Sequence, residues 1–423
     1  MTLPPEPPAA PTAPPGASGR SPASAGSRPV VRRSQGRGWI VLAGVVVVAA
    51  VLVGAGAMTH WYGLAPAARV LPPGACPGGV TITGAGASFL SPLISQWSTT
   101  FTANSTDKLS YNPSGAGAGI TSWESNLVNF AATDEPLTGA EVQALPGTTL
   151  TLPVTGGAVT IVYNIPDFSG PLQLTGEQLA EIYLGTVTNW NDSRLASDNH
   201  YLPSATIDPV VRSDAAGTSY VLTNYLSDDS ATFASAVGIS IQPNWPSIAT
   251  ETSQHGNSNL VKYVASSAGD DSIGYVDLAD AQTYDPGGIA AMGNPSGDFI
   301  VPTVADTQSA IDYWAAHQTI PAATGNWSAV SWVNSPQAAD YPLATLSYFL
   351  VLQNPGLAGS TTDPSLAYTQ VIVAWLEWTI SASQQAYAAP LKYDVPPAAL
   401  LTEDAAAVSA MNYNGASIPA CTV

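Results

Sequence analysis

Basic side chains are scarce in this sequence of 423 residues, which holds 11 Lys and Arg against 30 Asp and Glu and has a net charge of −19. Five of the basic residues precede residue 38. From residue 59 onward six basic side chains stand against twenty-nine acidic ones, a balance of −23. Such an excess of negative charge argues against nucleic acid and anionic lipid as partners. An anion bound to this part of the chain must be held by local donors, because the overall field repels it.

Histidine and cysteine are also scarce, with four and two residues, respectively. The four histidines are scattered without the spacing of metal ligands, and no serine has a recognisable base partner. We therefore expect no catalytic residue, no metal and no cofactor, with a phosphatase-type enzyme as the weaker alternative. The two cysteines, Cys76 and Cys421, lie near the two ends of the expected folded region. This placement suits a disulfide in an exported domain, with two unpaired thiols as the alternative.

The N-terminal part of the chain has three segments of distinct composition. Residues 1–37 are rich in Pro, Ala, Ser and Gly, and we expect a disordered cytoplasmic tail. Residues 38–58 contain a run of twenty residues without a charge, long enough for one transmembrane helix, and residues 59–77 read as a linker. Arginines precede the apolar run, so we expect a single-pass signal anchor in the cell membrane with the folded domain extracytoplasmic. A cleaved signal peptide is the alternative, because small residues at 54–57 and 65–68 could serve as cleavage sites.

The remaining sequence repeats one local order, in which a short β-branched run is followed by a glycine-rich turn and then by apolar residues at helical spacing. Residues 80–83 lead into such a turn and a helix, and residues 109–111 lead into the turn 113–119 and a second helix. Residues 129–134 form a third strand. This order is typical of parallel β/α units whose ligand loops follow the strand ends, so the predicted fold class is α/β.

One stretch, residues 209–226, combines an arginine with a helix start. An apolar approach leads to Arg212 and Asp214, a small-residue turn follows, and Gly217 and Thr218 open a helical pattern. Free N–H groups at a helix N-terminus, together with a guanidinium that offers paired donors, favour an anion. An exposed turn with a local salt bridge is the alternative for this stretch taken alone.

Three further pieces would bring groups to the same point. Ser88 and Phe89 open one helix, the small-residue loop 114–119 opens another, and Asp134 ends a strand. A buried carboxylate beside an anion is tolerable if the anion carries a proton that the carboxylate accepts. The same carboxylate would repel a fully ionised anion such as sulfate. The combination with Arg212 predicts a site for a protonated oxyanion, of which phosphate is the obvious example.

Several motifs resemble those of the phosphate-binding (PstS-like) proteins of bacterial phosphate ABC importers, in the periplasmic-binding-protein superfamily. The resemblance covers roughly residues 80–412, and the motifs occur in the family's order. They are residues 83–89 (TGAGASF), 129–137 (NFAATDEPL), 157–164, 182–192, 212–218 (RSDAAGT) and 272–275 (SIGY), with 341–343 and 391–397 near the C-terminus.

The resemblance implies a two-lobed fold with a hinge, in which lobe 1 comprises residues 78–158 and 275–423 and lobe 2 comprises residues 159–274. It also implies inorganic phosphate as ligand and an ABC permease in the membrane as partner. A surface or sensing protein that keeps the fold, but binds phosphate weakly or takes another oxyanion, is the alternative. The polar stretch from about 284 to 340 has no explanation in these terms.

The resemblance also implies roles for individual residues. Ser88 and Thr218 would donate hydroxyl and N–H groups, Asp134 would accept the ligand's proton, and Arg212 would pair with the anion with Asp214 behind it. The implied ligand-binding residues are Ser88, Phe89, Ala116, Asp134, Arg212, Ala216, Gly217 and Thr218.

Two of these positions depart from the family pattern, because Ala116 and Ala216 stand where the family has serines. Two hydroxyl donors are therefore missing, while the backbone N–H groups remain. At roughly 1–2 kcal/mol for each hydrogen bond to a charged group, we expect the affinity to fall by about one to three orders of magnitude.

Overall fold

A computed structural model of the chain describes residues 75–137, 141, 147–168, 170–246, 252–357 and 365–422. The expected tail (1–37), transmembrane anchor (38–58) and nearly all of the linker (59–77) lie outside these residues. Among the described residues, no helix has both the length and the apolar character needed to span a membrane.

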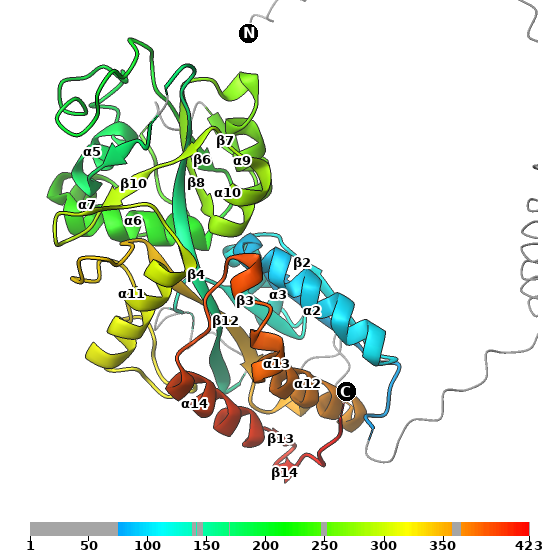
Figure 1. Cartoon of the computed structure of the whole chain (residues 1–423). Coiled ribbons are helices and arrows are strands. Elements are labelled where there is room, and N and C mark those ends of the chain that lie inside the picture. Colours follow the sequence, from blue (N-terminus) through cyan, green and yellow to red (C-terminus); the bar gives the residue numbers. More distant parts are fainter. Residues whose placement is uncertain are drawn as a thin grey trace, which may run out of the picture. The chain divides into compact units, whose positions relative to one another are not determined.

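One continuous sheet runs through the described part of the chain (Figure 1). Its strand order is β2-β1-β3-β12-β4-β8-β6-β7, and the short β9 (Gly288–Ile289) pairs with β4 on the edge opposite β8. Strands β1, β2 and β3 are parallel to one another, as are β8, β6 and β7. The strands are β1 (Thr81–Gly86), β2 (Lys108–Asn112), β3 (Phe130–Thr133), β12 (Ala344–Leu352), β4 (Thr149–Asn164), β8 (Ser272–Asp277), β6 (Asp208–Arg212) and β7 (Thr252–Gln254).

The long strand β4 belongs to both halves of this sheet. Its first part, to Ala158, pairs with β12, and its second part, from Val159 to Asn164, pairs with β8. All of its residues except the two at its ends are buried, as expected of an apolar run that crosses between two cores. We call the β12 side lobe 1 and the β8 side lobe 2.

Helices pack on both faces of each half of the sheet (Figure 1). In lobe 1 these are α2 (Ser91–Asn104), α3 (Ala116–Glu124), α11 (Val304–His317), α12 (Leu366–Thr379), α13 (Ala382–Gln385) and α14 (Ala398–Ser409). In lobe 2 they are α5 (Gly176–Tyr183), α6 (Gly217–Asp229), α7 (Ala231–Ala236), α9 (Asn257–Val264) and α10 (Leu278–Tyr284). Helix α5 begins with a capping box, because the Thr175 hydroxyl accepts from the N–H of Gln178 and the Gln178 side chain accepts from the N–H of Thr175.

Short strands that come after β8 pair with strands of lobe 2. β9 pairs with β4 through Val162 and Tyr163, and β10 (Ala291–Gly293) pairs with β5 (Gln173–Leu174). β11 (Phe299–Ile300) then pairs with β10. The next helix, α11, contacts β4 and β12 of lobe 1.

The stretch from 284 to 340 was unexplained by the sequence, and its later part, from α11 onward, packs on lobe 1. Trp327 and Trp332 are each 3% exposed and form a small core with Ile311 of α11 and Tyr348 of β12. The indole N–H of Trp332 donates to the Tyr348 hydroxyl at 2.7 Å. These side chains lie in a loop, so they follow no helical or strand period.

The predicted disulfide between Cys76 and Cys421 is confirmed. Beside it, Ala75 and Thr422 form a parallel β-bridge, and the N–H of Cys76 donates to the Thr422 carbonyl at 3.1 Å. Cys421 lies against α12, where its sulfur contacts the Gln370 carbonyl at 3.6 Å. The two ends of the folded part therefore meet on lobe 1.

Candidate functional site

The arginine of the site ends strand β6. Its side chain is 1% exposed, and its Nε donates to Oδ1 of Asp214 at 2.9 Å while Nη2 donates to the other carboxylate oxygen. Burial by itself would raise the pKa of Asp214, but the hydrogen bonds and charge of Arg212 hold that pKa below its ordinary value. The Asp214 carboxylate also accepts from the N–H of Gly256 at 3.0 Å. The guanidinium is thus a buried cation held by an ionised partner.

The remaining guanidinium donors connect the two lobes. Nη1 of Arg212 donates to the Thr218 hydroxyl at 2.8 Å and to the amide oxygen of Asn257, both in lobe 2. Nη2 donates to the Ser88 hydroxyl of lobe 1 at 3.3 Å. Ser88 follows the end of β1 and begins a short 3-10 helix (Ser88–Leu90) that leads into α2. The structure therefore brings three of the predicted residues, Ser88, Arg212 and Thr218, into direct contact.

Asp134 approaches the same point from lobe 1. It follows the end of β3, is 1% exposed, and accepts a hydrogen bond at Oδ1 from the Ser347 hydroxyl of β12. Burial raises the pKa of Asp134 to about 7, against the lowering effects of the Ser347 hydrogen bond and the Arg212 charge. The carboxyl group can therefore exist in either protonation state near neutral pH.

Gly217, the first residue of α6, packs directly on this carboxyl group. A Cβ added at Gly217 would lie 2.5 Å from the Cβ of Asp134 and would also collide with Oδ2. Only glycine permits so close an approach of α6 to β3. The N–H groups of Gly217 and Thr218 belong to the first helical turn, where no carbonyl of the helix itself can accept from them.

The small-residue loop of lobe 1 packs on the Arg212–Gly217 turn of lobe 2. Gly115 has a φ of +93°, caps α3 and donates its N–H to the Gly86 carbonyl at 2.9 Å. The N–H of Gly117 donates to the Ala215 carbonyl at 3.2 Å. Ala116 is the first residue of α3 and is fully buried between them. A serine hydroxyl in this loop, that of Ser114, is buried without a partner among the described residues.

Some groups of two predicted residues, Ala216 and Phe89, already have partners within the protein. Ala216 caps α6, but its N–H donates to the Ile241 carbonyl at 2.8 Å and so is already used within the protein. The ring of Phe89 is buried against Tyr393, at 5.6 Å between ring centroids, and its carbonyl accepts from the Tyr393 hydroxyl at 2.6 Å. The Phe89 side chain therefore has a packing role.

Sequence reasoning did not identify several polar groups that support the site. The N–H of Arg212 donates to the Tyr275 hydroxyl at 3.1 Å, and that hydroxyl lies 2.7 Å from the Ser219 hydroxyl. Tyr275 lies within the SIGY motif noted above, which is the only local signal. Ser347 and Asn257 gave none, because a polar residue within an apolar strand or at a helix start has many possible partners.

Four of the groups lie at the C-terminal ends of parallel strands. Arg212 is the last residue of β6, and Ser88, Asp134 and Asn257 follow β1, β3 and β7, respectively. A cavity of about 140 Å³ opens beside them, lined by Ser88, Ser91 and Pro113 of lobe 1 and by residues 255–259 of lobe 2. Among the residues that the structure describes, no three His, Cys, Asp or Glu side chains gather as a metal site would require.

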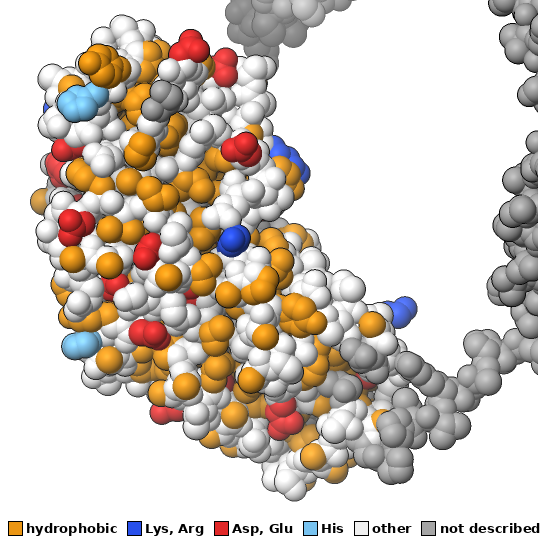
Figure 2. All heavy atoms as spheres, in the orientation of Figure 1, with side chains coloured by type: hydrophobic (Ala, Val, Ile, Leu, Met, Phe, Trp, Pro, Cys, Tyr) orange, Lys and Arg blue, Asp and Glu red, His pale blue; other side chains and the backbone are white. Residues whose placement is uncertain are grey.

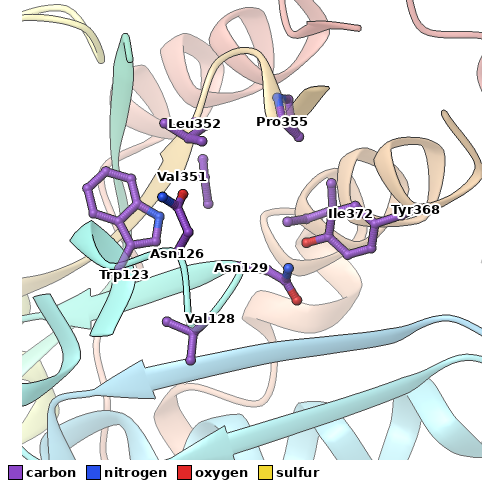
Figure 3. A pocket seen from close by; sticks show the side chains of 9 residues that line it. All are labelled: Trp123, Asn126, Val128, Asn129, Val351, Leu352, Pro355, Tyr368 and Ile372. Carbon is purple, nitrogen blue, oxygen red and sulfur yellow. The ribbon is translucent and has the colours of Figure 1, made fainter. Parts of the chain in front are cut away.

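Two further views bear on where an anion can bind. Figure 2 shows that basic side chains are few on the visible face and that acidic ones are spread over both lobes. Figure 3 shows a second pocket, where Trp123 and Leu352 face Tyr368 and Ile372 of α12; it holds only about 20 Å³ and lies at the C-terminal ends of α3 and β12. That pocket has no charged lining residue, so the Arg212 cluster remains the candidate anion site.

Comparison with known proteins places the chain in a family. The family model described as "PBP superfamily domain" matches residues 72–383. The phosphate-binding protein PstS of Haemophilus influenzae is 30% identical over 321 residues, which is 75% of this chain and 89% of that relative. The chain belongs to the PstS family within the PBP superfamily.

Other PstS family members share shorter or more distant similarity. The phosphate-binding protein PstS of Xylella fastidiosa is 38% identical over 228 residues, 53% of this chain, and the chain spans 60% of that relative's length. The solved structure of the phosphate-binding protein from Stenotrophomonas maltophilia has a TM-score of 0.58 at 20% identity and covers 81% of this chain and 100% of its own. At that identity the likeness concerns the fold, and it confirms the two-lobed α/β architecture expected for the family.

Proposed function

We propose that the chain is an extracytoplasmic solute-binding protein that captures inorganic phosphate for an ABC importer. The observation that carries this proposal is the meeting of a buried cation and a buried proton acceptor at one point between the lobes. Two donors of Arg212 reach the hydroxyls of Ser88 and Thr218, and an anion can take these two donors when it enters. Asp134 faces the first turn of α6. The PstS relatives are named as phosphate-binding proteins, and the chain is accordingly a binding protein rather than an enzyme.

The chemistry of the two groups supports phosphate over other oxyanions. Phosphate carries one or two protons near neutral pH and can donate one of them to the free oxygen of Asp134. Sulfate has no proton, so a lone pair would face the ionised carboxylate. The buried site has little water to separate the two charges, which increases the repulsion.

Within this proposal each predicted residue has an assigned contact. Arg212 and the hydroxyls of Ser88 and Thr218 donate to phosphate oxygens, and the N–H groups of Phe89, Gly217 and Thr218 add backbone donors. Asp134 accepts the proton, and Asp214 holds Arg212. Ala116 contributes its N–H group, whereas Ala216 shapes the turn and adds no donor, because its N–H is bonded to Ile241.

We further propose that the lobes close over phosphate about a hinge at the two crossings of the chain between them. The change of partner along β4, between residues 158 and 159, supports the first crossing. We place the second crossing near residues 301–303, later than 274/275, because the pairing of β9, β10 and β11 favours it.

The location and the delivery partner are also part of the proposal. The apolar run at 38–58 would anchor the chain in the cell membrane, with residues 1–37 in the cytoplasm and the folded part outside. The membrane-embedded permease of a phosphate importer would receive the ligand. The confirmed disulfide is consistent with an oxidising compartment.

A titration of the full chain in detergent with phosphate and with sulfate tests the function. Heat and tryptophan fluorescence report binding, since Trp327 and Trp332 pack beside β12 of lobe 1. Saturable phosphate binding without sulfate binding is the expected result. Saturation only at millimolar phosphate would favour the alternative of a surface or sensing protein that binds phosphate weakly. The alanines at 116 and 216, in place of the family's serines, support that alternative. Binding of neither anion at millimolar concentration would contradict the proposal.

A further inference from the structure

Asn257 is a buried amide beside Arg212 that has no role in the proposed function. It is the first residue of α9 and has an exposed fraction of 0%. It follows Gly256, whose φ of +75° lets the chain turn from β7 into the helix. A fully buried amide must satisfy its donors and its acceptor within the protein, so its partners indicate its role.

The hydrogen bonds of Asn257 connect the arginine with both lobes. Its amide oxygen accepts from Nη1 of Arg212 and from the Thr218 hydroxyl, the latter at 3.3 Å. Its Nδ2 donates to Oδ2 of Asp277 at 2.8 Å. Its main-chain N–H donates to the Ser88 hydroxyl of lobe 1 at 3.3 Å. The residue therefore contacts the guanidinium and both of the hydroxyls that the guanidinium contacts.

The amide can take only one orientation at this place. A guanidinium has donors and no acceptor, so the amide oxygen must face Arg212 and Nδ2 must face Asp277. Asp277 is held in turn, because its Oδ1 accepts from the N–H of Asp280 at 2.9 Å and so caps α10. A chain of hydrogen bonds thus runs from the start of α10 through Asn257 to the guanidinium.

A neutral acceptor suits this position better than a charged one. Arg212 already pairs with Asp214 through Nε and Nη2. A second carboxylate at Nη1 would leave excess negative charge around the guanidinium and weaken its attraction for an anion. An amide oxygen holds Nη1 without adding charge.

We propose that Asn257 is a positioning residue, which fixes the Nη1 end of the Arg212 guanidinium so that its donors and its charge stay directed at a bound oxyanion. This inference rests on the proposed function, because it takes phosphate as the ligand of the Arg212 cluster. Asn257 would keep the guanidinium of Arg212 oriented without neutralising its positive charge further.

Phosphate titrations of the full chain and of the N257A, N257D and Q282A variants test the proposal, with thermal unfolding of each ligand-free protein measured in parallel. N257A removes the side-chain bonds and keeps the main-chain bond to Ser88, so we expect about tenfold weaker phosphate binding. N257D keeps the shape and the contact with Arg212 but adds a charge, so we expect about hundredfold weaker binding at about pH 8. Q282A changes an exposed amide of α10 in lobe 2 and serves as the control, with an affinity within about twofold of the original.

The pH profile separates positioning from a merely structural role. The introduced carboxyl would face the Arg212 guanidinium, with Asp214 on its other side, and Asp277, with Asp280 beside it. Burial raises the pKa of Asp277, so at about pH 5 the introduced carboxyl and Asp277 can share a proton while the introduced carboxyl still accepts from Arg212. The affinity of N257D relative to the original protein should therefore recover. That of N257A should not recover. Equal affinities of N257A and the original chain, or identical pH-independent losses in N257A and N257D, would overturn the inference. Failure of the original chain to bind phosphate would instead count against the proposed function.

Discussion

Replacing Asp134 with asparagine should change both the anion preference and the stability of the protein. Asp134 presents one oxygen to the Ser347 hydroxyl and the other to the start of α6. Residue 217 must be glycine there, because a Cβ on it would collide with Asp134. An asparagine can turn either its oxygen or its NH₂ group toward the ligand, because the Ser347 hydroxyl can donate or accept. The variant can therefore accept a hydrogen bond from phosphate or donate one to sulfate.

The size of the change in preference follows from the group that faces the anion. At about pH 9, well above the pKa of about 7 of Asp134, sulfate would meet an ionised carboxylate in a buried site, and an unmatched contact of this kind is unfavourable by about 3 kcal/mol. Removing it should lower the ratio of sulfate to phosphate dissociation constants by about a hundredfold. Competition calorimetry with the two anions measures this ratio directly. An unchanged ratio would refute the role assigned to Asp134.

The effect on stability is separate and depends on pH. Burial raises the pKa of Asp134 from 3.8 to about 7, so the folded state holds the proton to higher pH than the unfolded state. The carboxyl's contribution to the free energy of unfolding is therefore fully present below about pH 4 and is lost as the pH rises through about 7. A pKa difference of about three corresponds to about 4 kcal/mol as an upper bound. In urea unfolding, D134N should be more stable than the original at about pH 8, and the difference should vanish near pH 4; a less stable D134N at pH 8 would contradict this account.

Three further predictions concern the turn before α6 and the disulfide. Gly217→Ala should weaken phosphate binding by about a hundredfold or more, because the new Cβ collides with Asp134 and keeps the lobes apart, and calorimetry measures the loss. Ala216→Ser should tighten phosphate binding by about tenfold, because it supplies a hydroxyl at the start of α6, and the same titration detects it. Replacing Cys76 and Cys421 together with serine should reduce the free energy of unfolding by about 2–5 kcal/mol in urea while leaving phosphate affinity unchanged.

Each of these outcomes has a control or a contrary result. Gly170→Ala is the control for Gly217→Ala, since its Cβ would lie 3.8 Å from the nearest neighbour and its affinity should be unaltered. Weaker binding by Ala216→Ser would mean that the turn cannot hold a hydroxyl beside the ligand. A fall in phosphate affinity after loss of the disulfide would show that the ends of the folded part influence the Arg212 cluster.

Local signals in the sequence predicted much of this fold. The strand ending at Asp134 and the helices after the first two glycine-rich turns could each be inferred from a few neighbouring residues, because strand and helix periodicities show within short segments. The sequence did not predict β9 and β10, which pair with strands of lobe 2. Those strands are only two and three residues long, too short to leave a periodic pattern.

The residues that the sequence did not reveal depend on contacts between distant parts of the chain. Ser347 meets Asp134 across 213 residues, and Asn257 meets Ser88 across 169, so nothing near either residue could indicate the contact. Trp327 and Trp332 lie in a loop, and their burial follows from the shape of α11 and β12. The use of the Ala216 N–H by Ile241 likewise depends on where a later loop returns.

The disulfide and the Ala75–Thr422 bridge also determine how a mechanical load would pass through the molecule. Both ends of the folded part are fastened together against α12 of lobe 1. Tension applied between the chain ahead of Cys76 and the chain after Cys421 would be borne by the disulfide and the bridge. Neither β4, where the strand changes partners, nor the contacts between Ser88, Arg212 and Asp134 lies on the path of the force. Such a load on lobe 1 would therefore not oppose the proposed closure of lobe 2.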